Sequence, residues 1–249
     1  MLLAWLTLRR VDMQWRDWWR HYLISGLLTT GMPSLLFSYA ARYLPASYSA
    51  IINASTPLFG TLFAAIWLSD AITPRKLLGI VLGICGVAIV SQHDSSIAVS
   101  SHFYLAIGAC IGAAICYGLA SIYIKKYMAN AQPISIACGS HLLAGIFFLP
   151  LTLFNLPTWE SLQIFGIATL ALNALGLSLL CSALAYILFY QLAQQVGPTK
   201  TLSVTLLVPL FSMLWGALFL HEIITLTMLA GCALVLFSTY LVIYKNDKK

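Results

Sequence analysis

The sequence predicts an all-α polytopic membrane protein in which an inverted repeat builds a bundle of helices. Three observations support this fold class: an apolar composition, apolar blocks of helical length, and charges confined to the seams between the blocks. The chain is 61% hydrophobic and 8% charged, and its mean hydropathy is +0.91. A water-soluble surface needs far more charge than this. Blocks of roughly 20 apolar residues are long enough for a helix to cross a ~30 Å hydrocarbon layer.

Eight complete membrane-spanning helices are expected, together with an N-terminal stump of a ninth. Their ranges are 22–43, 45–69, 74–92, 103–125, 133–154, 164–193, 198–220 and 224–244. The connections are short, so neighbouring helices should run antiparallel. Thr73 followed by Pro74 predicts a helix N-cap with proline at the first helical position. The polar stretch 92–96 separates the chain into two halves.

The basic residues predict how the helices are oriented. When the helices alternate in direction, 12 of the 13 Lys and Arg residues fall on one side of the membrane, and Arg42 alone falls on the other. The twelve are Arg9, Arg10, Arg16, Arg20, Arg75, Lys76, Lys125, Lys126, Lys200, Lys245, Lys248 and Lys249. Short basic loops stay in the cytoplasm, so this side and the C-terminus are expected to be cytoplasmic in a cell inner membrane. Because these residues cap the spans, the net charge of +6 does not predict a nucleic-acid partner.

The two halves of the chain resemble each other at an offset of 152 residues. The matching pairs include Pro57 with Pro209, Leu58 with Leu210, Phe59 with Phe211, Asp70 with Glu222, Thr73 with Thr225, and Gly79 with Gly231. Five spans separate the members of each pair, and an odd number of spans inverts the second copy in the membrane. Such inverted repeats are a common transporter plan, with the substrate site near the midplane. Asp70 and Glu222 are expected to complement the dipole of the helix that follows each, or to form a gating contact.

The first repeat is expected to span residues 1–92 and to be incomplete, whereas the second spans 102–245 and is complete. The second repeat begins near His102, so its counterpart would begin about 50 residues before Met1, enough for one helix and most of another. Segment 2–8 would then be the stump of the second helix. Arg9 and Arg10 follow this segment in an order that is wrong for a signal peptide. A truncation or a misplaced start would explain the shortfall.

Two passages resemble the drug/metabolite transporter superfamily, specifically its EamA type. One runs from Tyr43-Leu44-Pro45-Ala46 through Pro57-Leu58-Phe59 to Asp70, Thr73, Gly79, Gly83 and Gly86. The other runs from Gly197-Pro198 through Pro209-Leu210-Phe211 to Glu222, Thr225 and Gly231. The resemblance covers nearly the whole chain. It implies ten helices in two inverted five-helix repeats and transport of small metabolites, such as amino acids, across the bacterial inner membrane. The chain departs from the family pattern by its short N-terminus and by Asp70, where Glu is usual.

Pro57 and Pro209 occupy equivalent positions inside their predicted helices. A proline there frees the carbonyl four residues earlier, which is that of Asn53 or Thr205, and tends to kink the helix. A carbonyl freed in lipid must find a partner or line a wet cavity. Both interpretations stay open: a pair of hinges beside a substrate path, or two packing kinks.

Polar and amphipathic side chains at midplane depth are the candidates for a substrate cavity. They are Tyr39, Asn53, Ser55, Tyr117, Ser121, Asn173, Tyr186, Tyr190, Gln191 and Trp215. As a set they suit a neutral or zwitterionic solute with an apolar portion, although any one of them could simply bond to its own backbone. His141 is the ionisable residue well inside a span, as a functional group or as a packing histidine. No Asp or Glu lies mid-span, so exchange or facilitated diffusion fits as well as proton coupling.

The expected function is a secondary transporter that moves a small metabolite across the cytoplasmic membrane by alternating access. Its expected partners are a small-molecule substrate and the lipid bilayer, with no cofactor and no metal, and a homodimer is one open arrangement. The six Cys residues show no CxxC spacing. A non-transporting fragment or an assembly subunit is the alternative. An enzyme is not expected, because Ser140 and His141 are adjacent on a helix and point about 100° apart.

Overall fold

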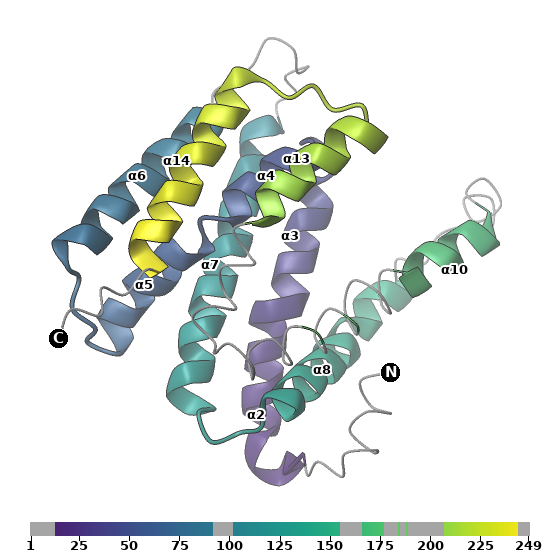
Figure 1. The fold of residues 1–249 in the computed structure, drawn as a ribbon. Coiled ribbons are helices and arrows are strands. Elements are labelled where there is room, and N and C mark those ends of the chain that lie inside the picture. Colours follow the sequence, from purple (N-terminus) through teal and green to yellow (C-terminus); the bar gives the residue numbers. More distant parts are fainter. Residues whose placement is uncertain are drawn as a thin grey trace. The chain divides into compact units, whose positions relative to one another are not determined.

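The computed structural model describes residues 13–91, 102–154, 166–176, 184, 188 and 207–243, and no strand occurs among them. The helices are α2 (Trp15–Gly26), the π-helical segment η1 (Leu27–Gly31), α3 (Met32–Ala40), α4 (Ala46–Asn53), α5 (Thr56–Trp67), α6 (Pro74–Val90), α7 (Phe103–Tyr127), α8 (Pro133–Phe154), α10 (Ile167–Gly176), α13 (Leu207–Phe219) and α14 (Leu226–Ile243), drawn in Figure 1. The all-helical fold class predicted from the sequence is therefore confirmed for the described residues.

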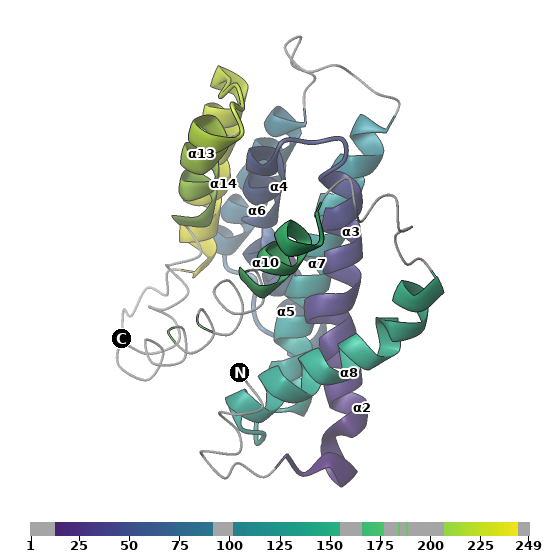
Figure 2. The same cartoon turned by 90° about the vertical axis from the view of Figure 1, so that its right-hand side faces the viewer.

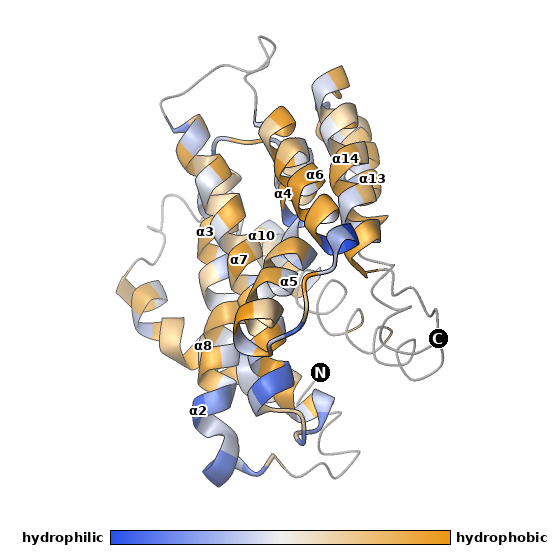
Figure 3. Ribbon diagram, turned by 90° about the vertical axis from the view of Figure 1, so that its left-hand side faces the viewer, coloured by the Kyte–Doolittle hydropathy of each residue, from blue (hydrophilic) through white to orange (hydrophobic). Residues whose placement is uncertain are grey.

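Five described helical stretches are long and apolar enough to cross a membrane. They are Trp15–Ala40, Ala46–Trp67, Phe103–Tyr127, Pro133–Phe154 and Leu226–Ile243. These helices expose large apolar side chains, for example Ile66 at 72% and Phe154 at 89% of their surface. Figure 3 shows apolar colours along the helices and hydrophilic colours mainly towards helix ends and connections. Lipid solvates such a surface and water does not, so the chain is a multi-pass membrane protein.

Two predicted boundaries differ from the structure in an informative way. The helix expected over 22–43 begins at Trp15 and ends at Ala40. Its first turns carry Arg16, Asp17 and Arg20, which lowered the hydropathy and hid the helix start in the sequence. A helix can extend beyond the hydrocarbon layer, because charged side chains near its end reach the interface.

The chain divides into two compact units that do not coincide with the two sequence halves. The first unit combines residues 1–26 with 131–202, and the second combines 27–130 with 203–249. Each unit therefore draws on both halves of the sequence. Most of the described helices, including α3 to α7, α13 and α14, belong to the second unit.

In the first unit, α2 packs closely against α8. A Cβ atom on Gly26 would collide with the backbone carbonyl of Ser140, and one on Gly139 would lie 2.6 Å from the ring of Tyr22. The hydroxyls of Ser25 and Ser140, both buried, lie 2.6 Å apart and form a hydrogen bond. Small residues and hydroxyl pairs of this kind hold helices together in lipid.

In the second unit, α6 and α14 lie side by side and antiparallel (Figure 1 and Figure 2). A Cβ on Gly79 would lie 2.7 Å from Cγ2 of Val242, and one on Gly231 would collide with Cγ2 of Val90. Residue numbers rise along α6 as they fall along α14. Glycine at both crossings lets the two backbones approach, which is how helices associate in membranes.

The helix expected over 45–69 is interrupted near Pro57. Helix α4 ends at Asn53, and α5 begins at Thr56, so the break lies at Ala54 and Ser55. Pro57 has no N–H to donate to the carbonyl of Asn53, and the hydroxyl of Thr56 donates to that carbonyl instead, at 2.7 Å. The predicted interruption is confirmed, and the freed carbonyl has found a partner within the chain, as lipid requires.

The turn that joins α5 to α6 has a well-defined hydrogen-bond pattern. The N–H of Asp70 donates to the carbonyl of Ala64 at 3.2 Å, across Ser69, whose φ is +55°. The hydroxyl of Thr73 then accepts from the N–H of Lys76 at 3.3 Å. Thr73 is thus the N-cap that the sequence predicted.

The turn that joins α13 to α14 repeats this pattern. The N–H of Glu222 donates to the carbonyl of Gly216 at 3.0 Å, across His221, whose φ is +53°. The hydroxyl of Thr225 accepts from the N–H of Met228 at 3.3 Å. Every residue of this turn stands 152 positions after its counterpart in the first turn. The sequence match at this offset therefore extends to backbone conformation.

We expect both capping threonines to stabilise the fold to a similar extent. Thr73→Ala and Thr225→Ala should each lower the free energy of unfolding by about 1 kcal/mol, since each leaves one helix-start N–H without its acceptor. Thermal unfolding of the detergent-solubilised variants, followed by size-exclusion chromatography after heating, measures the effect. Thr152→Ala is the control, because the Thr152 hydroxyl is exposed and bonds only within its own helix, to Leu149. A cap variant no less stable than this control would contradict the assignment.

Candidate functional site: an apolar cavity and two helix-end contacts

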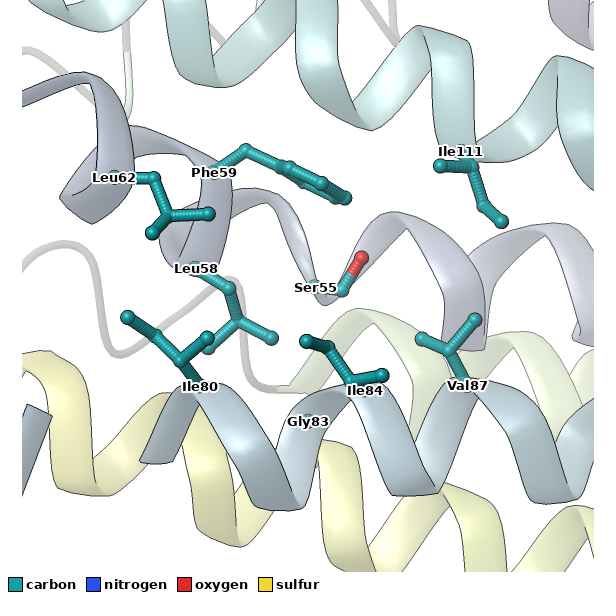
Figure 4. A pocket seen from close by; sticks show the side chains of 9 residues that line it. All are labelled: Ser55, Leu58, Phe59, Leu62, Ile80, Gly83, Ile84, Val87 and Ile111. Carbon is teal, nitrogen blue, oxygen red and sulfur yellow. The ribbon is translucent and has the colours of Figure 1, made fainter. Parts of the chain in front are cut away.

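An apolar cavity of about 230 Å³ lies among α5, α6 and α7 in the second unit (Figure 4). Its lining residues are Ser55, Leu58, Phe59, Leu62, Ile80, Gly83, Ile84, Val87 and Ile111. In Figure 4 the side chains from α5 and those from α6 face each other across the space. A cavity of ~150 Å³ with such a lining binds benzene. This one is therefore large enough for the apolar part of a small organic solute.

Among the predicted cavity residues that the structure describes, Ser55 alone lines this space. It is buried and lies at the break between α4 and α5, and its hydroxyl donates to the carbonyl of Ile52 at 2.6 Å. The same break places Leu58 and Phe59 on the cavity wall directly after Pro57. The local interruption predicted from the sequence thus positions one side of the cavity, while the lining itself is almost entirely apolar.

Five other predicted cavity residues of the second unit are not among those that line this space. The hydroxyl of Tyr39 bonds with Nδ1 of His102 at 3.2 Å. The ring of Tyr117 stacks on Phe37 with centroids 6.4 Å apart. The Ser121 hydroxyl donates to the Gly118 carbonyl at 2.7 Å, the Trp215 ring packs against Phe219, and the Asn53 amide oxygen accepts from Thr56. Each is engaged with its own surroundings, as the alternative interpretation of such residues allowed.

The remaining predicted site residues belong to the first unit or lie outside the described residues. Nδ1 of His141 lies 2.8 Å from the carbonyl of Ala137, one turn earlier in α8. Asn173 is exposed on α10. Tyr186, Tyr190 and Gln191 lie outside the described residues. The contact of His141 with the Ala137 carbonyl is one that a packing histidine makes, and it does not by itself assign His141 a role in transport.

Glu222 makes a contact that the sequence did not reveal. Its carboxylate accepts from the N–H groups of Ala46 and Ser47, at 2.6 and 3.2 Å, and also from the Ser47 hydroxyl. These groups form the first turn of α4, so the carboxylate caps a helix in the other half of the chain. The hydroxyl of Thr225, and not Glu222, accepts an N–H at the start of the helix that follows. The expected effect of Glu222 on the dipole of that helix stays a prediction. Spacing along the chain could not have identified a partner 175 positions away.

Asp70 holds the equivalent place in the first repeat and has a different partner. Its carboxylate lies 3.9 Å from Nζ of Lys125, and the two side chains are 48% and 65% exposed. Next to this pair, Nζ of Lys126 donates to the carbonyl of Trp67 at 3.2 Å. An exposed pair at this distance contributes little to stability. The end of the unit that holds Asp70 is called the lysine end below, and the end that holds Glu222 is called the glutamate end.

Comparison with known proteins identifies the family. Residues 1–92 and 104–244 match the EamA-like transporter family. The chain is 29% identical to the uncharacterized transporter YvbV of Bacillus subtilis over 99% of its own length and 79% of that protein. It is 24% identical to an uncharacterized transporter of Archaeoglobus fulgidus, over 94% of its length and 80% of that protein.

Two further comparisons concern a named activity and the fold. A protein named "Probable terminal-alkyne amino-acid exporter", from Streptantibioticus cattleyicolor, is 23% identical over 82% of this chain and 67% of its own length. One protein of known crystal structure, 17% identical, shares the fold with a TM-score of 0.59 over 96% of this chain and 81% of its own. With the family match covering nearly the whole chain, the protein belongs to the EamA-like transporter family and is a membrane transporter of small solutes.

Proposed function

We propose that the protein is a secondary transporter that carries a small, amino-acid-like organic solute across the cytoplasmic membrane by alternating access. The observation that supports this mechanism best is the relation between α6 and α14. At the offset of 152 residues, Gly79 corresponds to Gly231, and Val90 corresponds to Val242. Gly79 of the first repeat packs against Val242 of the second, and Gly231 of the second packs against Val90 of the first. Exchange of partners in this way is what two copies related by a twofold axis in the membrane plane produce.

The matching turns support the same plan. The turn at Asp70 and the turn at Glu222 have one hydrogen-bond pattern, yet they lie at opposite ends of the second unit. We therefore propose two inverted repeats, over residues 1–92 and 102–245, in the arrangement of eight complete spans inferred from the sequence. Alternating access then consists of opening one end of the bundle while the other closes around a site near the midplane.

The class of solute is supported by two observations. The cavity beside Pro57 admits an apolar group of side-chain size, and the Streptantibioticus relative is named as an amino-acid exporter. Apolar pockets with few polar groups bind the apolar portion of a ligand and leave orientation to polar groups nearby. A zwitterion with an apolar side chain meets both requirements, and the Ser55 break would supply the polar groups nearest to the cavity.

Orientation in the membrane follows from the positive-inside rule. Arg75, Lys76, Lys125 and Lys126 gather at the lysine end, so we place this end and the C-terminus in the cytoplasm of an inner membrane. Cysteine labelling tests this placement in a variant without the native cysteines. Ala129→Cys, at the lysine end, should react with an impermeant maleimide only after the membrane is opened. Ala41→Cys, at the glutamate end, should react in intact cells. Reaction of both residues from one face would refute the orientation.

Transport itself is tested with purified protein in proteoliposomes loaded with a panel of unlabelled amino acids. We expect saturable exchange of a radiolabelled amino acid with an apolar side chain, and no exchange in protein-free vesicles. The variant Ile84→Trp, which places a bulky ring at the cavity, should raise the KM for such a solute more than it lowers kcat. Absence of exchange for every solute class tried, with folded protein in the vesicles, would contradict the proposed function.

A further inference from the structure

We propose that Glu222 and the first turn of α4 form a latch that holds the glutamate end of the transporter closed. The latch is made when the transport path is shut at that end and is broken when the path opens there. This inference rests on the proposed alternating-access function and deepens it by naming a residue that controls which side is open. The components of the latch are the Glu222 carboxylate, the N–H groups of Ala46 and Ser47, and the Ser47 hydroxyl.

The chemistry of a helix start explains why a carboxylate binds there. The first N–H groups of a helix have no partner within the helix, and they carry the positive end of its dipole. Pro45 stands immediately before α4 and cannot supply a capping hydroxyl or carboxylate of its own. Glu222 provides the missing acceptor with a full negative charge, and hydrogen bonds to an ionised group are about twice as strong as neutral ones.

The space for this carboxylate is created by Gly216, which is buried on α13. A Cβ atom at this position would lie 2.5 Å from Oε2 of Glu222 and 2.8 Å from the Ser47 hydroxyl. The carbonyl of Gly216 also accepts the backbone N–H of Glu222 at 3.0 Å. One glycine therefore both anchors the turn that carries Glu222 and leaves room for its side chain.

The latch joins the two halves of the sequence at the glutamate end of the second unit. Glu222 belongs to the second repeat and the start of α4 to the first, so opening the bundle at this end separates the two partners. The equivalent residue at the lysine end, Asp70, is 48% exposed beside Lys125. Two turns with one backbone pattern thus have unlike side-chain contacts at the two ends. A transporter that is closed at one end and open at the other is expected to have different side-chain contacts at its two ends.

A native cysteine reports whether this end is open. Cys110 is fully buried on α7, and its thiol contacts the hydroxyl of Ser49, two residues after Ser47 on α4. In a variant that keeps Cys110 as its sole cysteine, the rate of reaction with an impermeant thiol reagent from the outer face measures opening. We expect Glu222→Gln to raise this rate about tenfold, since it weakens a charged hydrogen bond. Gly216→Ala should raise it as well, because the added methyl group displaces the carboxylate.

Two control variants separate a latch from a cap that merely stabilises the fold. Asp70→Asn makes the equivalent change at the lysine end and should leave outer labelling of Cys110 unchanged. Thr225→Ala removes a neighbouring helix cap and should lower thermal stability without raising the rate. Reaction is measured well below the unfolding temperature of every variant. An unchanged Cys110 rate in Glu222→Gln, or an equal rise in Thr225→Ala, would overturn the latch. Solute exchange by the unmutated protein is measured separately, so failure of the latch and failure of the transport proposal give different results.

Discussion

One added methyl group at Gly231 should lower the free energy of unfolding by about 1–3 kcal/mol, the range for overpacking a well-packed core. A Cβ there would collide with Cγ2 of Val90 and lie 2.9 Å from the backbone carbonyl of Gly86. A valine side chain can rotate, but a backbone carbonyl on the neighbouring helix moves only if the two helices separate. Gly231→Ala is therefore expected to loosen the pairing of α6 with α14, and Gly231→Leu to leave little folded protein.

Gly108 offers a matched control, at which the same substitution should raise stability rather than lower it. It lies in the interior of α7 with nothing within 4 Å of the position its Cβ would take. Gly108→Ala should raise stability by roughly 0.5–1 kcal/mol, because alanine loses less conformational freedom than glycine in a helix. Thermal unfolding in detergent, followed by the fraction of monodisperse protein after heating, compares the two variants. Equal shifts for Gly231→Ala and Gly108→Ala would show that the α6–α14 crossing is not tightly packed.

The close helix pairing was only partly accessible from the sequence. The glycines at 79 and 231 were found as a repeated pair, because a repeat is visible in one chain. Their partners Val242 and Val90 were not, because a contact between distant helices leaves no mark on local periodicity. The two turns were likewise predictable only in part. Thr73 was recognised as an N-cap from its neighbour Pro74, while the conformation of Ser69 and His221 required coordinates.

The candidate site was less predictable than the fold. Polar residues were expected to form the cavity, since function in lipid is commonly carried by groups that lipid solvates poorly. The cavity found is lined by Leu, Ile, Val and Phe, with Ser55 as its polar member. Apolar residues are so frequent in this chain that sequence alone could not separate those lining a cavity from those facing lipid. Glu222 was noticed as half of a repeated acidic pair, but its partner at the start of α4 was not foreseen.

Replacing Pro57 with alanine should slow transport about tenfold, corresponding to ~1.4 kcal/mol in the barrier for the slowest step. Alanine restores the N–H that can donate to the carbonyl of Asn53, so α4 and α5 can merge into one continuous helix. Pro57 lies in the first turn of α5, where proline is tolerated, so the variant should unfold at about the temperature of the unmutated protein. The break at Ser55 then no longer allows α5, which carries Leu58 on the cavity wall, to tilt against α4. Initial exchange rates in proteoliposomes measure the loss.

Pro150 separates the effect of a hinge from the general effect of removing a helical proline. It lies inside α8 in the first unit, is exposed, and is not among the residues that line the cavity. Pro150→Ala should unfold at a temperature no lower than the unmutated protein, because it removes a proline from a helix interior, and should leave the exchange rate unchanged. Because the two substitutions are chemically identical, a loss of rate in Pro57→Ala alone locates the moving break at residues 54 and 55. Full exchange activity in Pro57→Ala, or equal losses in both variants, would assign Pro57 to packing, the other interpretation that the sequence left open.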